Sequence, residues 1–229
     1  MENLIRYAPL LAQGALVTVA LALTSLALAT LLGGLGAAGR VAGGRVARGA
    51  VLAYTTIVRG IPDLVVILLI YFGGQRLVNV VLNALGAEPV SVSPFLAGMI
   101  SIGFIYGAYL TETFRGAFLA VPPGQAEAAR ALGMHPFPAF WTVVRPQLLR
   151  FALPGYANVW QVLVKSTAVV SVIGLQDLVG LADNAGKTVR QPFLFFTVVL
   201  GVYLLITWVS TTIFDRMERR GARGFSRAL

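Results

Sequence analysis

Five long apolar runs most constrain what this chain of 229 residues can fold into. Four of them carry at most one charged side chain, and the fifth is interrupted only by Lys165. A bilayer core of about 30 Å is crossed by roughly 20 helical residues. Backbone polar groups in lipid must be bonded within the chain, which makes helices the fitting structure. The sequence therefore predicts an all-α, polytopic membrane protein with five transmembrane helices, at residues 13–35, 63–82, 94–118, 149–174 and 192–214.

The composition agrees with a membrane domain. Hydrophobic residues make up 57% of the chain and charged residues 12%, whereas soluble domains carry about 25% charged residues. We expect one transmembrane domain over residues 1–229, with a core at about 10–215 and a tail at 215–229. The chain has no cysteine, which excludes disulfides and thiolate metal sites.

The distribution of arginine predicts the orientation. The net charge is +9, but no basic-aromatic surface motif accompanies it, so we expect no nucleic-acid partner. Most arginines fall after the first span, after the third span or in the tail: Arg40, Arg45, Arg48, Arg115, Arg130, Arg145, Arg150, Arg216, Arg219, Arg220, Arg223 and Arg227. Cytoplasmic loops are enriched in Lys and Arg. The N-terminus should therefore lie outside and the C-terminus in the cytoplasm.

A short polar helix is predicted in the loop after the third span, at about residues 119–148. Pro122 and Pro123 suit a helix start, and Gly133 stands where a left-handed residue ends a helix. Pro136 and Pro138 then prevent that helix from continuing. Such a helix on the basic side can present a knob to a soluble partner.

This loop resembles the EAA loop of ATP-binding-cassette (ABC) importer permeases. The family pattern is E-A-A, three residues, G, nine residues, then I-x-L-P. Arg145 stands in place of the family's Leu, and Val143 in place of its Ile. The matching residues, which the resemblance implies couple the permease to its ATPase, are Glu127, Ala128, Ala129, Gly133 and Pro146.

Asp63 directly follows the sequence Arg-Gly-Ile-Pro, where we expect the helix to break. The break separates a short helix at about residues 50–61, which we expect at the membrane interface, from the second span. Near a helix N-terminus its charge complements the helix dipole. Asp63 is therefore either a structural cap, with Arg59 snorkelling, or part of a substrate path or gate.

Glu112 and Arg115 share one face near the end of the third span. An ionisable side chain inside a span is costly and is a functional hypothesis by default. The alternative is an ion pair that orients the helix at the interface.

Asn158, Gln161 and Lys165 form a polar stripe on the fourth span. Such a stripe faces a watery path or a partner helix rather than lipid. Both alternatives stay open from the sequence.

The resemblance extends over about residues 10–215 and is greatest to the polar amino-acid group, in particular the permease subunits for histidine and for lysine, arginine and ornithine, with opine permeases next. It rests on the Arg-Gly-x-Pro entry before Asp63, on residues 106–116, on residues 155–169 and on residues 185–187. It implies a multi-pass inner-membrane protein that imports a polar, basic amino acid. It further implies two ATP-binding subunits, a second permease chain, identical or homologous, and a periplasmic substrate-binding protein.

No cofactor is expected on this chain, and ATP and Mg are expected on the partner ATPase. Gly186-Lys187-Thr188 lacks the upstream glycine spacing of a phosphate-binding loop, and the lone His135 cannot build a metal cluster. The chain is thus predicted to be a transport subunit and not an enzyme. A secondary amino-acid transporter is the alternative of another class, but it would usually show an internal repeat of its spans, and none is visible.

Overall fold

The computed structural model describes residues 2–222, and this part of the chain contains helices and no strand. The elements are α1 (Glu2–Ala42), α2 (Arg45–Gly60), α3 (Asp63–Leu68), η1 (Leu69–Gly73), α4 (Gly74–Ala84), α5 (Pro94–Ala120), α6 (Pro123–Ala131), α7 (Pro136–Ala139), η2 (Phe140–Val144), α8 (Arg145–Ser166), η3 (Thr167–Ile173), α9 (Leu178–Thr188) and α10 (Pro192–Ala222). Elements η1 and η2 are π-helical turns, and η3 is a 3₁₀ helix.

Five helical segments are long and apolar enough to cross a membrane, which confirms the five predicted spans. They are Asn3–Ala42, Asp63–Ala84, Pro94–Ala120, Pro136–Ile173 and Pro192–Gly221. The predicted start of the fourth span at residue 149 was wrong, because the helical path begins at Pro136. Pro136 occupies the first turn of α7, where its missing N–H costs nothing, so a new helix starts there.

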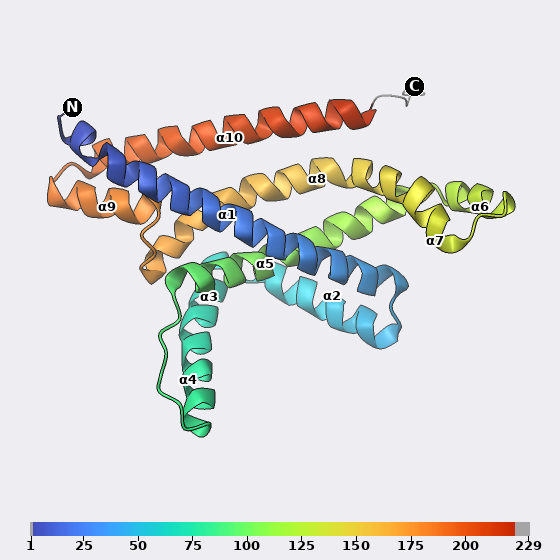
Figure 1. Ribbon diagram of the computed structural model, residues 1–229, viewed down its shortest axis with the longest axis horizontal. Coiled ribbons are helices and arrows are strands. Elements are labelled where there is room, and N and C mark those ends of the chain that lie inside the picture. The colour runs from blue at the N-terminus through green and yellow to red at the C-terminus, as the bar shows by residue number, and fades with distance from the viewer. Residues whose placement is uncertain (1, 223–229) are drawn as a thin grey trace.

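The core lies between α1 and α5, which run side by side (Figure 1). Small residues let the two backbones approach closely. A Cβ added at Gly103 would meet the Leu28 side chain, and one added at Gly33 would lie 2.5 Å from the Leu110 Cβ. Close contact through small residues is the usual way in which membrane helices associate, because lipid supplies no hydrophobic driving force between them.

A smaller core packs α9 against α1 and α10. Leu11, Ala182 and Phe195 are buried there. Asp177 caps α9 by accepting a hydrogen bond from the Gly180 amide at 2.9 Å. The Leu178 amide donates to the Thr18 hydroxyl at 3.1 Å, which ties α9 to the middle of the α1 face.

We call α3, η1 and α4 the arm. Its first part, α3, packs against α5, and its last part, α4, projects away from the other long helices in Figure 1. The arm follows the predicted break at Ile61 and Pro62, whose backbones are extended. Residues 85–93 return along α4, and the Val92 amide donates to the Gln75 side chain at 2.6 Å. Helix α4 has no buried residue.

Helix α2 confirms the predicted short helix before that break, although it begins earlier, at Arg45. It packs beside α1 and α5.

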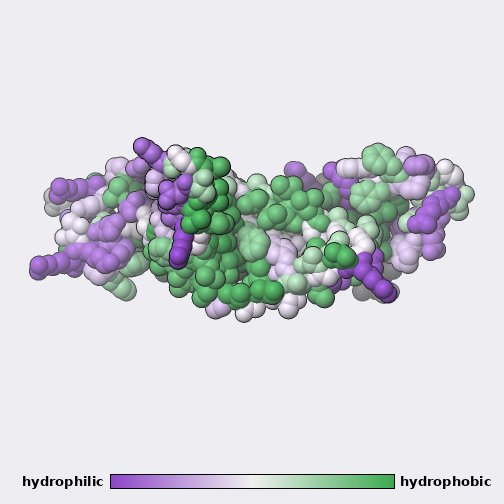
Figure 2. All heavy atoms as spheres, turned by 90° about the horizontal axis from the view of Figure 1, so that it is seen from below, coloured by the Kyte–Doolittle hydropathy of each residue, from purple (hydrophilic) through white to green (hydrophobic). Residues whose placement is uncertain are grey.

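The segments rich in arginine gather at one end of the molecule. The C-terminal ends of α1 and α10 lie at the same end as α6 and α7 (Figure 1). Figure 2 shows hydrophilic residues at both ends and a mostly hydrophobic stretch between them. Which side of the membrane this end faces stays a prediction, and Arg223 and Arg227 lie outside the described residues.

Candidate functional site

The polar loop helix forms as predicted and is α6. Pro122 and Pro123 start it, and Gly133 ends it with φ +80°. The Gly133 amide donates to the Arg130 carbonyl at 2.9 Å and the Met134 amide to the Ala129 carbonyl at 3.1 Å. These two bonds make a Schellman motif, which satisfies the last carbonyls of the helix and requires the left-handed residue that glycine supplies.

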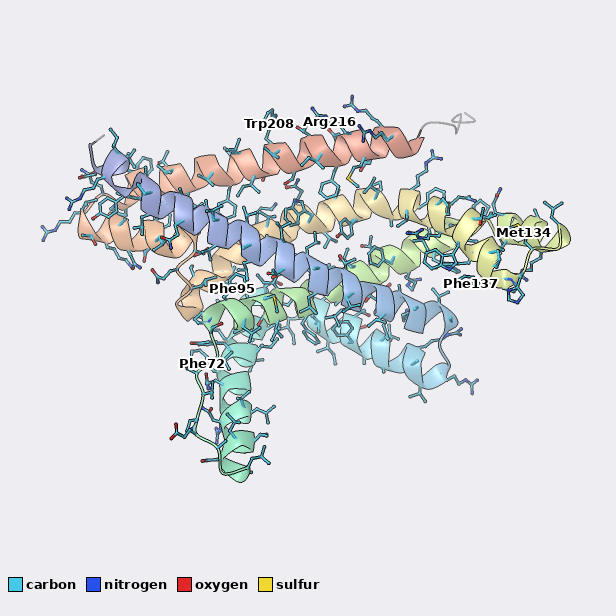
Figure 3. All side chains as sticks on the ribbon, viewed as in Figure 1. Phe72, Phe95, Met134, Phe137, Trp208 and Arg216 are labelled. Carbon is cyan, nitrogen blue, oxygen red and sulfur yellow. The ribbon has the colours of Figure 1, made fainter. Side chains whose placement is uncertain are left out.

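Helix α6 and the turn after it form a projecting knob (Figure 3). Glu127 and Ala128 are exposed, whereas Ala129 faces inward and is buried. Leu132 is 84% exposed and Phe137 is 67% exposed. Leu132 lies outside the spanning segments, and Phe137 lies in the first turn of the fourth one. Large apolar side chains exposed at the end of a spanning segment, beside a polar loop, mark an interaction surface.

The knob is tied to the fourth span. The Gln147 side chain, on α8, donates to the Gln125 side chain of α6 at 3.3 Å. Pro146 lies in the first turn of α8, directly after the π-helical turn η2. A displacement of α6 would therefore act on the beginning of α8.

A second polar group surrounds Asp63. Its Oδ2 accepts a hydrogen bond from the Tyr106 hydroxyl at 2.8 Å and another from the Ser166 hydroxyl at 2.9 Å. The structure thus joins the start of the arm to α5 and to the end of α8. Tyr106 and Ser166 were absent from our predicted site, although both lie in the segments that carry the family resemblance.

A third polar group surrounds Glu112, at the other end of the same α5 face. The Arg115 Nε lies 2.8 Å from one carboxylate oxygen of Glu112, and the Arg40 Nε lies 3.8 Å from the other. The ion pair that was one of the two alternatives for Glu112 is thus present, and the role of Glu112 in a substrate path stays a prediction. The Oε1 of Glu112 and the Nε of Arg40 are nevertheless buried without a hydrogen-bond partner among the described residues.

Aromatic rings connect the Asp63 group to the Glu112 group. Tyr106 and Tyr109 stack with their ring centroids 5.6 Å apart. The Arg59 guanidinium lies 5.1 Å from the Tyr109 ring centroid, a cation–π distance. Tyr106, Tyr109 and Glu112 follow at steps of three along α5 and so share a face.

A pocket of about 420 Å³ opens beside Glu112, between α1, α2 and α5. Its polar lining comprises Arg40, Thr55, Thr56, Arg59, Tyr109 and Glu112. Guanidinium groups bind carboxylates, and a carboxylate binds an ammonium or guanidinium group. The lining therefore offers partners for both charged ends of an amino acid.

The predicted polar stripe of α8 does not act as one surface. Gln161 donates to the Thr211 hydroxyl of α10 at 3.2 Å, so it links two helices. Asn158 and Lys165 are exposed on the described chain. Periodicity alone could not separate the helix link from the two exposed side chains.

No group of three or more metal-binding side chains occurs among residues that the structure describes.

The protein-family comparison matches residues 29–223 to the binding-protein-dependent transport system inner membrane component. The chain belongs to this family. Membership makes it a multi-pass transport subunit rather than an enzyme, and confirms the family resemblance seen in the EAA-type loop.

Curated relatives and a solved structure agree. The chain is 46% identical to the histidine/lysine/arginine/ornithine transport system permease protein HisQ of Salmonella typhimurium, over 97% of each chain. It is 45% identical to the octopine transport system permease protein OccQ of Rhizobium radiobacter, over 77% of this chain and 75% of the relative. An amino acid ABC transporter crystallised with histidines matches with a TM-score of 0.81 and 30% identity, over 95% of this chain and 96% of the other.

Proposed function

We propose that the chain is the membrane-spanning subunit of an ATP-driven importer of basic amino acids. The observation that carries the proposal is its 46% identity, over nearly the whole length, with a permease named for histidine, lysine, arginine and ornithine. The row formed on α5 by Tyr106, Tyr109 and Glu112 ends in the Glu112 carboxylate, and its other end, Tyr106, donates to the carboxylate of Asp63 on α3. Two carboxylates at this row favour a cationic solute.

The proposed complex contains two ATP-binding subunits, a second permease chain and a periplasmic substrate-binding protein, in the inner membrane. ATP and Mg would bind to the ATPase subunits. The loop at 119–148 would face the cytoplasm. The exposed Leu132 after α6 and the exposed Phe137 on α7 support this, because large apolar side chains at such a surface suit a protein partner.

We assign coupling to Glu127, Ala128, Ala129, Gly133 and Pro146. ATP-driven closure of the ATPase dimer would move α6, and the Gln125–Gln147 contact would carry that motion to α8. Gly133→Asp tests this role. An aspartate would be strained at the φ of +80° and would disturb the end of α6. We expect normal membrane insertion and a loss of transport-coupled ATPase activity, and transport at the wild-type rate would contradict the assignment.

We assign the substrate path to Asp63, Glu112, Asn158, Gln161 and Lys165, with Asp63 and Glu112 as the partners of the cationic group. The pocket beside Glu112 supports this through its two guanidinium groups, Arg40 and Arg59, which would take the carboxylate of the solute. The exposed Asn158 and Lys165 would meet the path only if the second permease chain encloses it.

Transport by the reconstituted complex tests the substrate class. We expect uptake of labelled arginine or lysine to be competed by histidine and ornithine and not by an acidic amino acid. Octopine is the second candidate, because the chain is also 45% identical to an octopine permease. Stronger competition by octopine than by arginine would favour that reading.

A Glu112 cycle separates solute contact from ion pairing. If Glu112 contacts the solute, Glu112→Gln should lower basic amino-acid transport and spare stimulation of ATPase activity by the loaded binding protein. If it only pairs with Arg115, the same change should impair assembly, and an added Arg115→Gln should partly restore it, because a lone buried charge is costly. Normal assembly with unchanged transport of every basic amino acid would remove Glu112 from the path.

A further inference from the structure

The turn between α9 and α10 carries an arginine where a helix end usually has glycine. The Arg190 amide donates to the Lys187 carbonyl at 3.3 Å, and the Gln191 amide donates to the Gly186 carbonyl at 2.9 Å. These two bonds make a Schellman motif like the one after α6, and the motif requires a left-handed residue. Arg190 is that residue, with φ +55°.

Two other helices end in the same motif and use glycine. Gly86 follows α4 with φ +72°, and Gly133 follows α6 with φ +80°. Within residues 2–222, Arg190 is the one residue other than glycine that has a positive φ. Because a Cβ crowds the backbone in this conformation, glycine would relieve the turn. The strain therefore points to a role for the arginine side chain itself.

The turn that carries Arg190 is well packed. Val189 packs against the smaller core of α1, α9 and α10. A Cβ added at Gly186 would lie only 2.8 Å from the Pro192 Cα, so α9 and the start of α10 approach closely. The guanidinium of Arg190 is thus presented from a fixed backbone and not from a loose loop.

The Arg190 side chain is exposed and forms no salt bridge with any carboxylate of the described chain. The Nζ of its neighbour Lys187 lies 2.5 Å from an Asp183 oxygen, so that charge is already compensated. This end of α9 lies outside the candidate membrane spans. Its other exposed side chains are polar and uncharged: Asn184, Thr188 and Gln191. One uncompensated positive charge therefore stands on a polar surface.

We propose that Arg190 anchors an acidic surface of the periplasmic substrate-binding protein. The inference rests on the proposed function, which supplies this partner and puts α9 outside, at the end of the molecule opposite to α6 and α7 (Figure 1). Arginine is enriched among the residues that dominate protein interfaces, and its planar donors fit a carboxylate in a bidentate pair. An anionic membrane would gain only about fivefold from one charge and would not require a fixed position for it.

Stimulation of ATPase activity by the loaded binding protein, measured on the whole complex in liposomes, provides the test. Arg190→Gly and Arg190→Gln both remove the charge, but only glycine relieves the backbone. We expect both variants to need about tenfold more binding protein for half-maximal stimulation, with the maximal rate unchanged. Arg190→Lys should keep most of the wild-type response. Arg190→Gly alone should raise the Tm, by roughly 2 °C.

Arg6→Gln is the matched control. Arg6 is also exposed at this end of the molecule and pairs with no carboxylate of the described chain, but it lies on ordinary helical backbone. Its replacement should leave the half-maximal concentration unchanged. An equal loss in Arg6→Gln would mean general surface charge and would overturn the inference.

Two further results would overturn it. One is a wild-type half-maximal concentration in Arg190→Gln. The other is a loss seen only in liposomes with phosphatidylglycerol and absent in phosphatidylcholine, which would assign Arg190 to the membrane surface. A wild-type complex that no loaded binding protein stimulates would instead overturn the proposed function, and with it the partner named here.

Discussion

Helix α5 and the arm are both predicted spans, yet they differ in how far their side chains are buried within the chain. Twelve residues of α5 are buried against other helices, whereas α4 has none. In the arm, Phe72 is 62% exposed and Leu77 is 66% exposed. Apolar composition thus predicts that a helix is removed from water, but it does not predict whether lipid or protein covers that helix. Helix α5 is covered by its own chain. Within the arm, α3 buries Val66 and Ile67 against the chain's own core, whereas α4 must be covered by lipid or by a second chain.

The largest effect is expected where α1 meets α5. A Cβ at Gly33 would lie 2.5 Å from the Leu110 Cβ, while one at Gly34 would meet nothing within 4 Å. Gly33→Ala should destabilise the chain by about 1–3 kcal/mol through overpacking. The neighbouring Gly34→Ala should be neutral or stabilising by up to about 1 kcal/mol, since alanine favours helix. Thermal unfolding in detergent compares the two, and equal behaviour would mean that the close approach is not needed.

An intermediate effect is expected at Asp177, the one fully buried carboxylate among the described side chains. Burial raises the pKa of this carboxyl group, and its Oδ2 has no hydrogen-bond partner within residues 2–222. The folded state therefore holds the proton more tightly than the unfolded state. The stability it contributes is present at low pH and is lost as pH rises from the unfolded pKa, near 3.8, through the raised folded pKa.

Asp177→Asn tests this directly, because asparagine caps a helix about as well as aspartate. We expect a higher Tm at pH 7, by roughly 2–4 °C, and a smaller difference near pH 4. Asp183→Asn on the same helix is the control, since Asp183 pairs with Lys187 at the surface. A lower Tm for Asp177→Asn at pH 7 would show that the charge itself stabilises the fold.

The smallest effect on the chain itself is expected in the arm. Leu77→Ser should change the unfolding free energy by less than about 0.5 kcal/mol, because Leu77 is 66% exposed on a helix that has no buried residue. It should still weaken association with the second permease chain if that chain covers the arm. Leu200→Ser, at a position on α10 that is 60% exposed, is the matched control. Cross-linking yields that fall equally in both variants would argue that lipid covers the arm.

The five spans and the α6 helix could be predicted because local signals determine them. Proline and glycine at residues 122–133 fix where α6 begins and ends, whatever surrounds it. Span lengths were underestimated for α1 and α10, because helices continue into the charged flanks where water satisfies the side chains. Local sequence also could not show that the π-helical turn η2 joins α7 to α8, so that the helical path of the fourth span begins at Pro136.

The sequence predicted which single polar residues are candidates for the site, but it did not predict which of them contact one another across helices. The pairing of Glu112 with Arg115 follows from spacing within one helix. The contacts of Asp63 with Tyr106 and Ser166 join positions 43 and 103 residues apart, and no single-helix pattern encodes them. The separation of Gln161 from Asn158 and Lys165 likewise depends on where α10 packs.

The π-helical turn at Phe140–Val144 has a consequence for how this loop can change over time. A π turn accommodates one residue more than an α turn, and one residue corresponds to about 100° of rotation around the helix axis. The extra residue is taken up within η2, so Phe137 and the attached α6 keep nearly the azimuth that an unbroken α-helix one residue shorter would give them. If residues 140–144 returned to α-helical bonding with no residue removed, the partner-facing side chains would turn by about 100° around the axis of α8. A deletion of one residue within residues 140–144 should therefore be tolerated better than a deletion of one residue in the regular part of α8.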